Sequence, residues 1–388
     1  MNTFINSLTL LRGLEKNALF NAFAQYCCCE DKDKTARQND LLCEIFAAGA
    51  ENGLADHLSE LILTDDNAFS RCCASGKSPS DYLKKAMWHD LQIIICAADV
   101  LQNVKTFDFG YWDEIISGTD SLKCLESFYK DNGYGKFLYN KAFTFIGGEL
   151  VPLGNTDEIT LDQLKNYGSE KKIILDNVDD FLNGLPYSHM LLYGDKGTGK
   201  SSTVHAVVNK LLNRKLRLIE VSKKDICLIP DIRRTIADIP LKFILFLDDL
   251  SLDERSDDIP SLKTVLEGSF SHSFGNAMLI ATSNRRHIVK ENHSDRQNSV
   301  HPSDHMDEQL SLSDRFGLTV MFSTTDKQAY LSIVEQLADD CKLKTDREVL
   351  RSLSERWALI KGGRSPRRAK QFIDLVYSCE QSKRPIDF

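Results

Sequence analysis

The chain has 388 residues, of which 42 % are hydrophobic, and its 48 Lys and Arg stand against 56 Asp and Glu for a net charge of −8. The length indicates two or three domains, and the composition is that of an ordinary soluble globular protein. The negative charge argues against broad binding to nucleic-acid backbones, although a local basic patch stays open. No run of eighteen apolar residues occurs, so we expect no membrane span.

The first seventeen residues lack the basic cluster, apolar stretch and small-residue cleavage site of a secretory signal. The eleven cysteines are odd in number and partly adjacent, as in the run 27–29, which favours a reducing, cytoplasmic location over a disulfide framework. The same run lacks the spacing that zinc ligands favour, so we interpret these residues as buried helix cysteines.

Residues 1–130 are predicted to form an N-terminal all-helical domain. Apolar residues recur there at helical spacing, for example Leu83, Met87, Leu91 and Ile94. No catalytic constellation stands out, so this domain is expected to position or bind a partner that the sequence does not identify.

Residues 131–165 are predicted to be a junction with short strands or a hairpin, since glycines punctuate an aromatic-rich stretch there. From Thr160 we expect a helical stretch that runs to Leu185. Within it, Tyr167 and Gly168 are candidates to border a nucleotide base.

Residues 166–325 alternate between apolar strands and helices. The strands are expected at 190–193, 216–221, 242–249, 277–284 and 318–322, and a mostly helical segment at 224–239. Apolar strands separated by helices imply an α/β fold with a parallel sheet covered on both faces. Ligands in such sheets sit at the carboxyl ends of strands, and every chemical candidate is expected to fall at a strand end. Residues 326–388 are helical again and form a small appended domain.

A phosphate-binding loop follows the first of these strands. Residues 194–201 fit the pattern G-x-x-x-x-G-K-[ST] between a strand and an amphipathic helix. Glycines at positive φ, backbone amides and the helix start would form a socket for nucleotide phosphates. Lys200 would reach the β- and γ-phosphates, and the Ser201 hydroxyl would ligate Mg²⁺. The loop therefore predicts a bound nucleotide with Mg²⁺, and the residues assigned to nucleotide binding in this loop are Gly194, Asp195, Lys196, Gly197, Thr198, Gly199, Lys200, Ser201 and Ser202.

Polar residues at the ends of two later strands complete the predicted site. Asp248 ends an apolar strand and is predicted to hold the Mg²⁺ shell, because two adjacent carboxylates are costly to bury for structural reasons alone. Asp249 is predicted to orient the attacking water, with Glu254 as the alternative base. Asn284 closes another strand and would hydrogen-bond the γ-phosphate or the water, although an asparagine also suits a turn.

Two arginines are candidates to stabilise charge on the γ-phosphate. Arg315 precedes the last strand, where a surface ion pair with Asp314 is the alternative. Arg367 starts a helix in a basic stretch, GGRSPRRAKQF, in which one of Arg364, Arg367, Arg368 and Lys370 would close onto the phosphates. Arg285, Arg286 and His287 directly follow Asn284 and are interpreted as a solvated face, with contact to nucleic acid or a partner as the alternative. The histidines 287, 293, 301 and 305 are interpreted as parts of a mobile loop, with a metal site that includes Asp295, Asp304 and Asp307 as the alternative.

These motifs together resemble the AAA+ ATPase superfamily. The phosphate loop, FILFLDD, TSN, SDRFG and SPRR match its Walker A, Walker B, sensor 1, arginine finger and sensor 2, in that order. The wider strings LLYGDKGTGKSS, FLDDLS, ATSNRRH and LSLSDRFG resemble those of the bacterial DUF815 family of P-loop ATPases, over residues 134–380.

The resemblance implies a nucleotide domain with a C-terminal helical lid that works as a homo-oligomeric ring, with a hexamer as one candidate size. Arg315 would then act in trans and Arg367 in cis. Walker B carries Asp248-Asp249 where the superfamily has Asp-Glu, which implies slow hydrolysis. The stretch after residue 221 lacks the aromatic-apolar-glycine loop of motors that thread polypeptides.

Three functions stay open at this stage. The first is an ATPase that remodels or loads a partner macromolecule, protein or nucleic acid. The second is a nucleotide-gated switch or scaffold with little turnover. The third is a DNA-associated loader, which only Arg285 and Arg286 suggest.

Overall fold

The computed structural model describes residues 6–101, 107–154, 157–250, 252–253, 262–263, 266, 275–284, 289–290 and 315–387. The chain divides into two compact units. The N-terminal unit is Met1–Asn140 with Asp238–Leu241, and the α/β unit is Lys141–Ala237 with Lys242–Phe388. The domain limits expected from the sequence, at 130, 165 and 325, stay a prediction.

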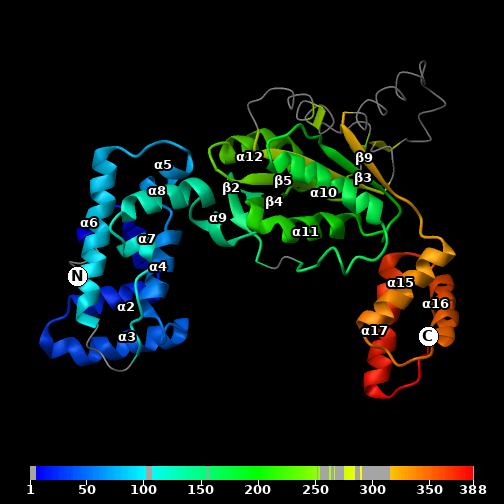
Figure 1. The fold of residues 1–388 in the computed structure, drawn as a ribbon, viewed down its shortest axis with the longest axis horizontal. Coiled ribbons are helices and arrows are strands. Elements are labelled where there is room, and N and C mark those ends of the chain that lie inside the picture. The colour runs from blue at the N-terminus through cyan, green and yellow to red at the C-terminus, as the bar shows by residue number, and fades with distance from the viewer. Residues whose placement is uncertain are drawn as a thin grey trace. The chain divides into compact units, whose positions relative to one another are not determined.

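The N-terminal unit is helical, as expected (Figure 1). Its helices are η1 (Leu11–Lys16), α2 (Ala18–Cys27), η2 (Asp31–Asp33), α3 (Lys34–Ala48), α4 (Leu54–Thr64), α5 (Ala68–Ala74), α6 (Asp81–Ala98), η3 (Asp99–Leu101), α7 (Glu114–Ser117), α8 (Ser121–Asn132) and α9 (Lys136–Tyr139). Local sequence sets several boundaries. Asn67 and Ser70 form a capping box at the start of α5, and Gly49 ends α3 in the left-handed conformation at φ 67°.

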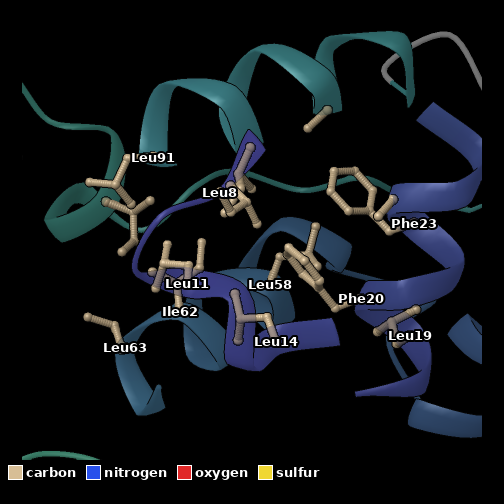
Figure 2. Packing of buried hydrophobic residues seen from close by; sticks show 14 of the residues in the cluster. Leu8, Leu11, Leu14, Leu19, Phe20, Phe23, Leu58, Ile62, Leu63 and Leu91 are labelled. Carbon is tan, nitrogen blue, oxygen red and sulfur yellow. The ribbon is translucent and has the colours of Figure 1, made fainter. Parts of the chain in front are cut away.

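Leucines and phenylalanines from several of these helices form one core (Figure 2). Phe20 and Phe23 of α2 and Leu58 and Ile62 of α4 all belong to this core, and all four side chains are completely buried. A buried carboxylate completes this packing, because Asp90 of α6 accepts backbone N–H bonds from Thr9, Leu10 and Leu11 at 2.6–3.0 Å. Asp90 is thus the hydrogen-bond acceptor for the backbone amides at the start of η1, although about eighty residues separate the two along the chain.

A seven-stranded sheet forms the centre of the α/β unit, in the order β2-β1-β4-β5-β7-β3-β9. The strands are β1 (Ala142–Ile146), β2 (Glu149–Pro152), β3 (Met190–Gly194), β4 (Leu216–Glu220), β5 (Lys242–Leu247), β7 (Ala277–Ser283) and β9 (Leu318–Phe322). All pairs are parallel except the β1–β2 hairpin. All seven residues of β7 are buried, as expected for a strand covered on both faces. This mainly parallel sheet confirms the fold class expected from the sequence.

The main helices of the α/β unit are α10 (Gly168–Leu182), α11 (Lys200–Leu211) and α12 (Ile229–Ile236). A two-residue pair, β6 (Leu252–Asp253) with β8 (Val289–Lys290), lies outside the main sheet. No described helix is long and apolar enough to cross a membrane.

Two helix predictions were wrong at their boundaries. The helix expected from Thr160 begins only at Gly168, because Asn166 and Tyr167 adopt positive φ values of 73° and 56° that a helix does not allow. The segment 224–239 divides into the 3₁₀ helix η5 (Lys223–Leu228) and α12, with Pro230 in the first turn of α12, where its missing N–H costs nothing.

The hairpin expected in residues 131–165 forms, but it begins at Ala142, since α8 and α9 occupy residues up to Tyr139. The hairpin is also part of the main sheet, because β1 pairs in parallel with β4.

Three helices form the C-terminal lid, as expected: α15 (Lys327–Asp340), α16 (Arg347–Ile360) and α17 (Pro366–Ser382). They pack around a core of their own that includes Tyr330, Val334, Phe372 and Val376. Ser365 caps α17 by accepting the N–H of Arg368, and Pro366 occupies its first position.

Candidate nucleotide site

The phosphate-binding loop connects the carboxyl end of β3 to α11, as the sequence predicts. Gly194, Gly197 and Gly199 all have positive φ, at 143°, 82° and 95°. A Cβ at Gly194 would lie 2.0 Å from the carbonyl oxygen of Phe322 in β9, so no other residue fits there. No side-chain hydrogen bond caps the start of α11. The amides of its first turn therefore point towards the loop, in the arrangement that binds anions.

Lys200 is the first residue of α11 and is only 7 % exposed. Its ammonium donates to the carbonyl oxygens of Gly194 and Asp195, both at 2.8 Å, and to Asn284 Oδ1 at 3.4 Å. Burial lowers the pKa of Lys200, and the nearby carboxylates of Asp195, Asp248 and Asp249 partly oppose this shift. The amine thus lies within the loop, beside groups that favour its charged form.

The two residues predicted to hold magnesium lie together. Ser201 Oγ donates to Asp248 Oδ1 at 2.5 Å, although 47 positions separate the two residues. Asp248 comes directly after β5, which ends at Leu247. A hydroxyl and a carboxylate are oxygen ligands of the kind that Mg²⁺ prefers, so this pair fits the ion.

Strand order explains how Asn284 reaches both halves of the site. β7 lies between the strand before the loop, β3, and the strand before the two acids, β5. Asn284 directly follows β7, so its Oδ1 accepts from Lys200 while its Nδ2 donates to Asp249 Oδ1. The structure therefore brings together Lys200, Ser201, Asp248, Asp249 and Asn284 at the carboxyl edge of the sheet.

Asp249 has an unusual backbone conformation, with φ of 50° in the left-handed region. Its carboxylate is held on both oxygens, since Asn284 donates to Oδ1 and Lys223 Nζ lies 4.0 Å from Oδ2. Lys223 begins η5, just after β4, and was not singled out in the sequence. The acid predicted to act as base therefore has two partners in this structure.

The lid contacts the phosphate loop through main-chain atoms. The N–H of Arg367 donates to the carbonyl oxygen of Gly197 at 3.3 Å. A Cβ at Gly197 would lie 3.1 Å from Ser365 Oγ and 3.4 Å from Arg367 Cβ, so this glycine permits the close approach. Arg367 is therefore next to the loop, where the sequence placed it. An ion pair of 2.8 Å between Lys165 and Asp340 is a second contact with the lid.

Arg315 differs from the other candidates in position. It precedes β9, and Leu318 at the start of β9 pairs with Met190 at the start of β3. It is therefore at the amino end of a parallel strand, about 13 Å or more from the phosphate-loop edge by strand rise alone. Unlike the other candidates, Arg315 therefore does not lie at the edge of the sheet that carries the phosphate loop.

Of the other candidates, Tyr167 has a different role from the one expected, and several lie outside the residues that the structure describes. Tyr167 is buried, with its ring 5.0 Å from that of Phe322 and its hydroxyl donating to Ser323 O at 2.6 Å, so it packs in the core rather than presenting a face to a base. The described residues do not include Glu254, Arg285, Arg286, Asp314 or the histidines 287–305. All eleven cysteines are thiols without disulfide bonds.

A glycine-rich loop after β3, an acid after β5, an amide after β7 and a helical lid lie in the order expected from the resemblance to AAA+ ATPases. The profile described as "Protein of unknown function (DUF815)" matches residues 137–380. Since the match covers more than half of the chain, the protein belongs to the DUF815 family, as its motifs predict.

A search of curated proteins found no match. Among solved structures, the RuvB Holliday junction branch migration motor of Thermotoga maritima shares 15 % identity over 58 % of this chain, with a TM-score of 0.39. AMPPCP-bound DnaA from Aquifex aeolicus shares 19 % identity over 58 % of this chain, with a TM-score of 0.40. The matches span 66 % of the RuvB chain and 68 % of the DnaA chain.

Proposed function

We propose that this protein binds ATP with Mg²⁺ at the phosphate loop and hydrolyses it. The observation that carries the proposal is the convergence of Lys200, Ser201, Asp248 and Asn284 within hydrogen-bond distance at the ends of three strands. Lys200 and the loop amides would hold the phosphates, and Ser201 and Asp248 would hold the ion, directly or through water. Bound magnesium supplies positive charge where the transferred phosphoryl group becomes more negative.

The direct test is Lys200→Ala with Lys210→Ala as its control. Lys210 is an exposed lysine at the other end of α11, so it has the same charge and helix but no part in the site. We expect Lys200→Ala to weaken ATP binding by at least tenfold and to abolish phosphate release, since a buried phosphate charge loses its partner. Equal ATP affinity and turnover in the two variants would refute the nucleotide site.

We further propose that the working unit is a homo-oligomeric ring that remodels or loads a partner macromolecule. The position of Arg315 supports it, because an arginine at the amino edge of the sheet reaches a γ-phosphate only on another copy. An arginine that does so increases hydrolysis by about 10³–10⁵-fold where it operates. Neither the client nor the number of copies follows from these residues.

Mixing two inactive variants tests the ring. Arg315→Ala keeps an intact phosphate loop, whereas Lys200→Ala keeps an intact arginine, so neither should turn over alone. In a one-to-one mixture about a quarter of the sites would combine an intact loop with an intact arginine. We therefore expect phosphate release to return to about a quarter of the wild-type rate. A mixture that stays as inactive as its components, while both variants still assemble, would contradict action in trans.

A nucleotide-gated switch with little turnover is the second candidate. It is favoured by Asp249, whose carboxylate is one methylene shorter than the glutamate of the superfamily and is held by Asn284 and Lys223. Steady-state phosphate release separates the two functions: ATP-dependent assembly without turnover would favour the switch. For a DNA-loading role, association with DNA that weakens as salt rises is the required observation.

A further inference from the structure

One buried polar residue of the α/β unit has no role in the site as proposed so far. Thr282 is the sixth residue of β7 and is only 1 % exposed. A hydroxyl inside an apolar strand is costly unless it is hydrogen-bonded. The partners of this hydroxyl are therefore informative.

Thr282 Oγ1 makes two bonds, both to the acids that follow β5. It donates to Asp248 Oδ1 at 2.6 Å and accepts the backbone N–H of Asp249 at 2.8 Å. Because a hydroxyl has one proton and Asp249 N can only donate, the direction of both bonds is fixed. The main-chain oxygen of Thr282 also accepts from Leu250 N at 2.6 Å. One residue of β7 thus contacts three consecutive residues after β5.

These bonds determine how the Asp248 carboxylate is presented. Its Oδ1 accepts from Ser201 Oγ at 2.5 Å, from Thr282 Oγ1 at 2.6 Å and from Asp249 N at 3.1 Å. Three donors on one oxygen fix the plane of the carboxylate. These three bonds all involve Oδ1, so Oδ2 is the oxygen that Asp248 would present to an ion or its water.

The same hydroxyl stabilises the turn at Asp249. A non-glycine residue at φ 50° is strained and persists only where its surroundings hold it. The Asp249 N–H has two acceptors there, Thr282 Oγ1 and Asp248 Oδ1. Thr282 therefore holds both the side chain of Asp248 and the backbone that sets the direction of the Asp249 side chain.

We propose that Thr282 is a positioning residue for the magnesium site, which acts by holding Asp248 and the Asp249 turn in register with Ser201. This inference rests on the proposed function, since that function supplies the ion. Thr282 itself does not touch the nucleotide or the ion.

The variants that test this role are Thr282→Val and Thr282→Ser. Valine has nearly the same shape but no hydroxyl, and serine restores the hydroxyl without the methyl group. The control is Ser59→Ala in α4, because Ser59 is also 1 % exposed and its hydroxyl likewise donates one bond, to Ala55 O, and accepts one, from Asp113 N. It thus reports the general effect of deleting a buried, doubly bonded hydroxyl.

The measurement is the affinity for a fluorescent ATP analogue as a function of free Mg²⁺, with thermal unfolding measured alongside. For Thr282→Val we expect unchanged affinity in EDTA and a free-Mg²⁺ midpoint raised by roughly tenfold or more, since a bond to a charged group is lost. Thr282→Ser should return the midpoint to within about threefold of wild type. Ser59→Ala should unfold at a lower temperature and keep the wild-type midpoint.

Two failures are distinguishable. If the wild-type protein gains no nucleotide affinity from Mg²⁺, the proposed function fails and the role of Thr282 with it. If the wild type does gain affinity and Thr282→Val has the same midpoint, whatever its melting temperature, only the positioning role is refuted.

Discussion

The carboxylates Asp90 in the N-terminal unit and Asp248 in the α/β unit differ in burial and in hydrogen-bond partners, since Asp248 is exposed. In the N-terminal unit Asp90 is completely buried, and its bonds from backbone amides are those of a cap for η1. In the α/β unit Asp248 bonds to side chains of two other elements, Ser201 in α11 and Thr282 in β7. A carboxylate on backbone amides stabilises a fold, whereas one among side chains at a strand end is arranged for a ligand.

The two regions also differ in charge. Residues 1–140 hold 13 of the 48 Lys and Arg and 20 of the 56 Asp and Glu, a net charge of −7. Residues 141–388 are therefore close to neutral at −1. The argument from charge against nucleic-acid binding thus applies to the N-terminal region and hardly constrains the α/β unit.

The largest effect that this comparison predicts is on stability, at Asp90. Asp90→Ala leaves three backbone N–H groups without an acceptor, and we expect it to cost about 3 kcal/mol or more in free energy of unfolding. Urea unfolding followed by tryptophan fluorescence in a Trp357→Phe background measures it, because the remaining tryptophans, Trp88 and Trp112, are both in the N-terminal unit. Asp90→Asn, which keeps an acceptor oxygen, should lose less.

A loss below about 1 kcal/mol for Asp90→Ala would break the comparison, because Asp90 would then have no capping role to contrast with Asp248.

The second-largest effect is expected at His189, a buried polar residue of the α/β unit that stabilises the fold and lies outside the candidate site. His189 is 5 % exposed, and its Nδ1 accepts the N–H of Leu279 at 3.1 Å. Burial and the nearby Arg233 lower the pKa of His189 from 6.5 to about 4. The unfolded chain therefore takes up a proton on this histidine at a higher pH than the folded chain, so its contribution is complete above pH 6.5 and is lost as the pH falls towards 4.

Between pH 7.5 and 5 we expect this group to cost about 2 kcal/mol of stability. Thermal unfolding of wild type and His189→Gln at both pH values checks it, since glutamine keeps an acceptor but does not titrate. If the two proteins lose the same stability over this range, His189 does not make the α/β unit acid-sensitive.

The smallest effect on stability is expected at Asp249, where a substitution should raise stability but lower activity. Asp249→Gly removes a left-handed non-glycine residue, and we expect it to raise the free energy of unfolding by about 0.5 kcal/mol. Phosphate release should fall to less than a tenth, because the acid is gone. Asp249→Asn keeps the side-chain shape and serves as the control, with similar loss of activity and no gain in stability.

If Asp249→Gly is less stable than wild type, the backbone at this position is not strained. Asp249 would then stabilise the fold, and it would no longer differ from Asp90 in this respect.

The sequence alone predicted most of the residues that meet at the candidate nucleotide site. The five parallel strands after residue 190 were found because each is a short apolar run, and the loop was found because its glycine spacing is specific to phosphate binding. Asp248 and Asn284 were found because each directly follows such a run.

Other features could not be predicted, because they depend on pairings between distant segments. No local pattern indicates that β1 joins the sheet beside β4, or that Asp90 caps η1. The left-handed residues 166 and 167 interrupt a pattern that otherwise favours a helix from Thr160. Thr282 did give a signal, as a polar residue within the run AMLIATS, but its partners depend on the neighbouring strand.

The contact between Arg367 N and Gly197 O has a mechanical consequence. Both atoms belong to the main chain, so replacing the arginine side chain leaves this tether intact, and only a change in the path of the backbone breaks it. A swing of α17 away from the loop would therefore break this hydrogen bond or move the turn that is expected to wrap the phosphates. The angle of the lid and the conformation of the loop are thus coupled, so that a change in one would alter the other.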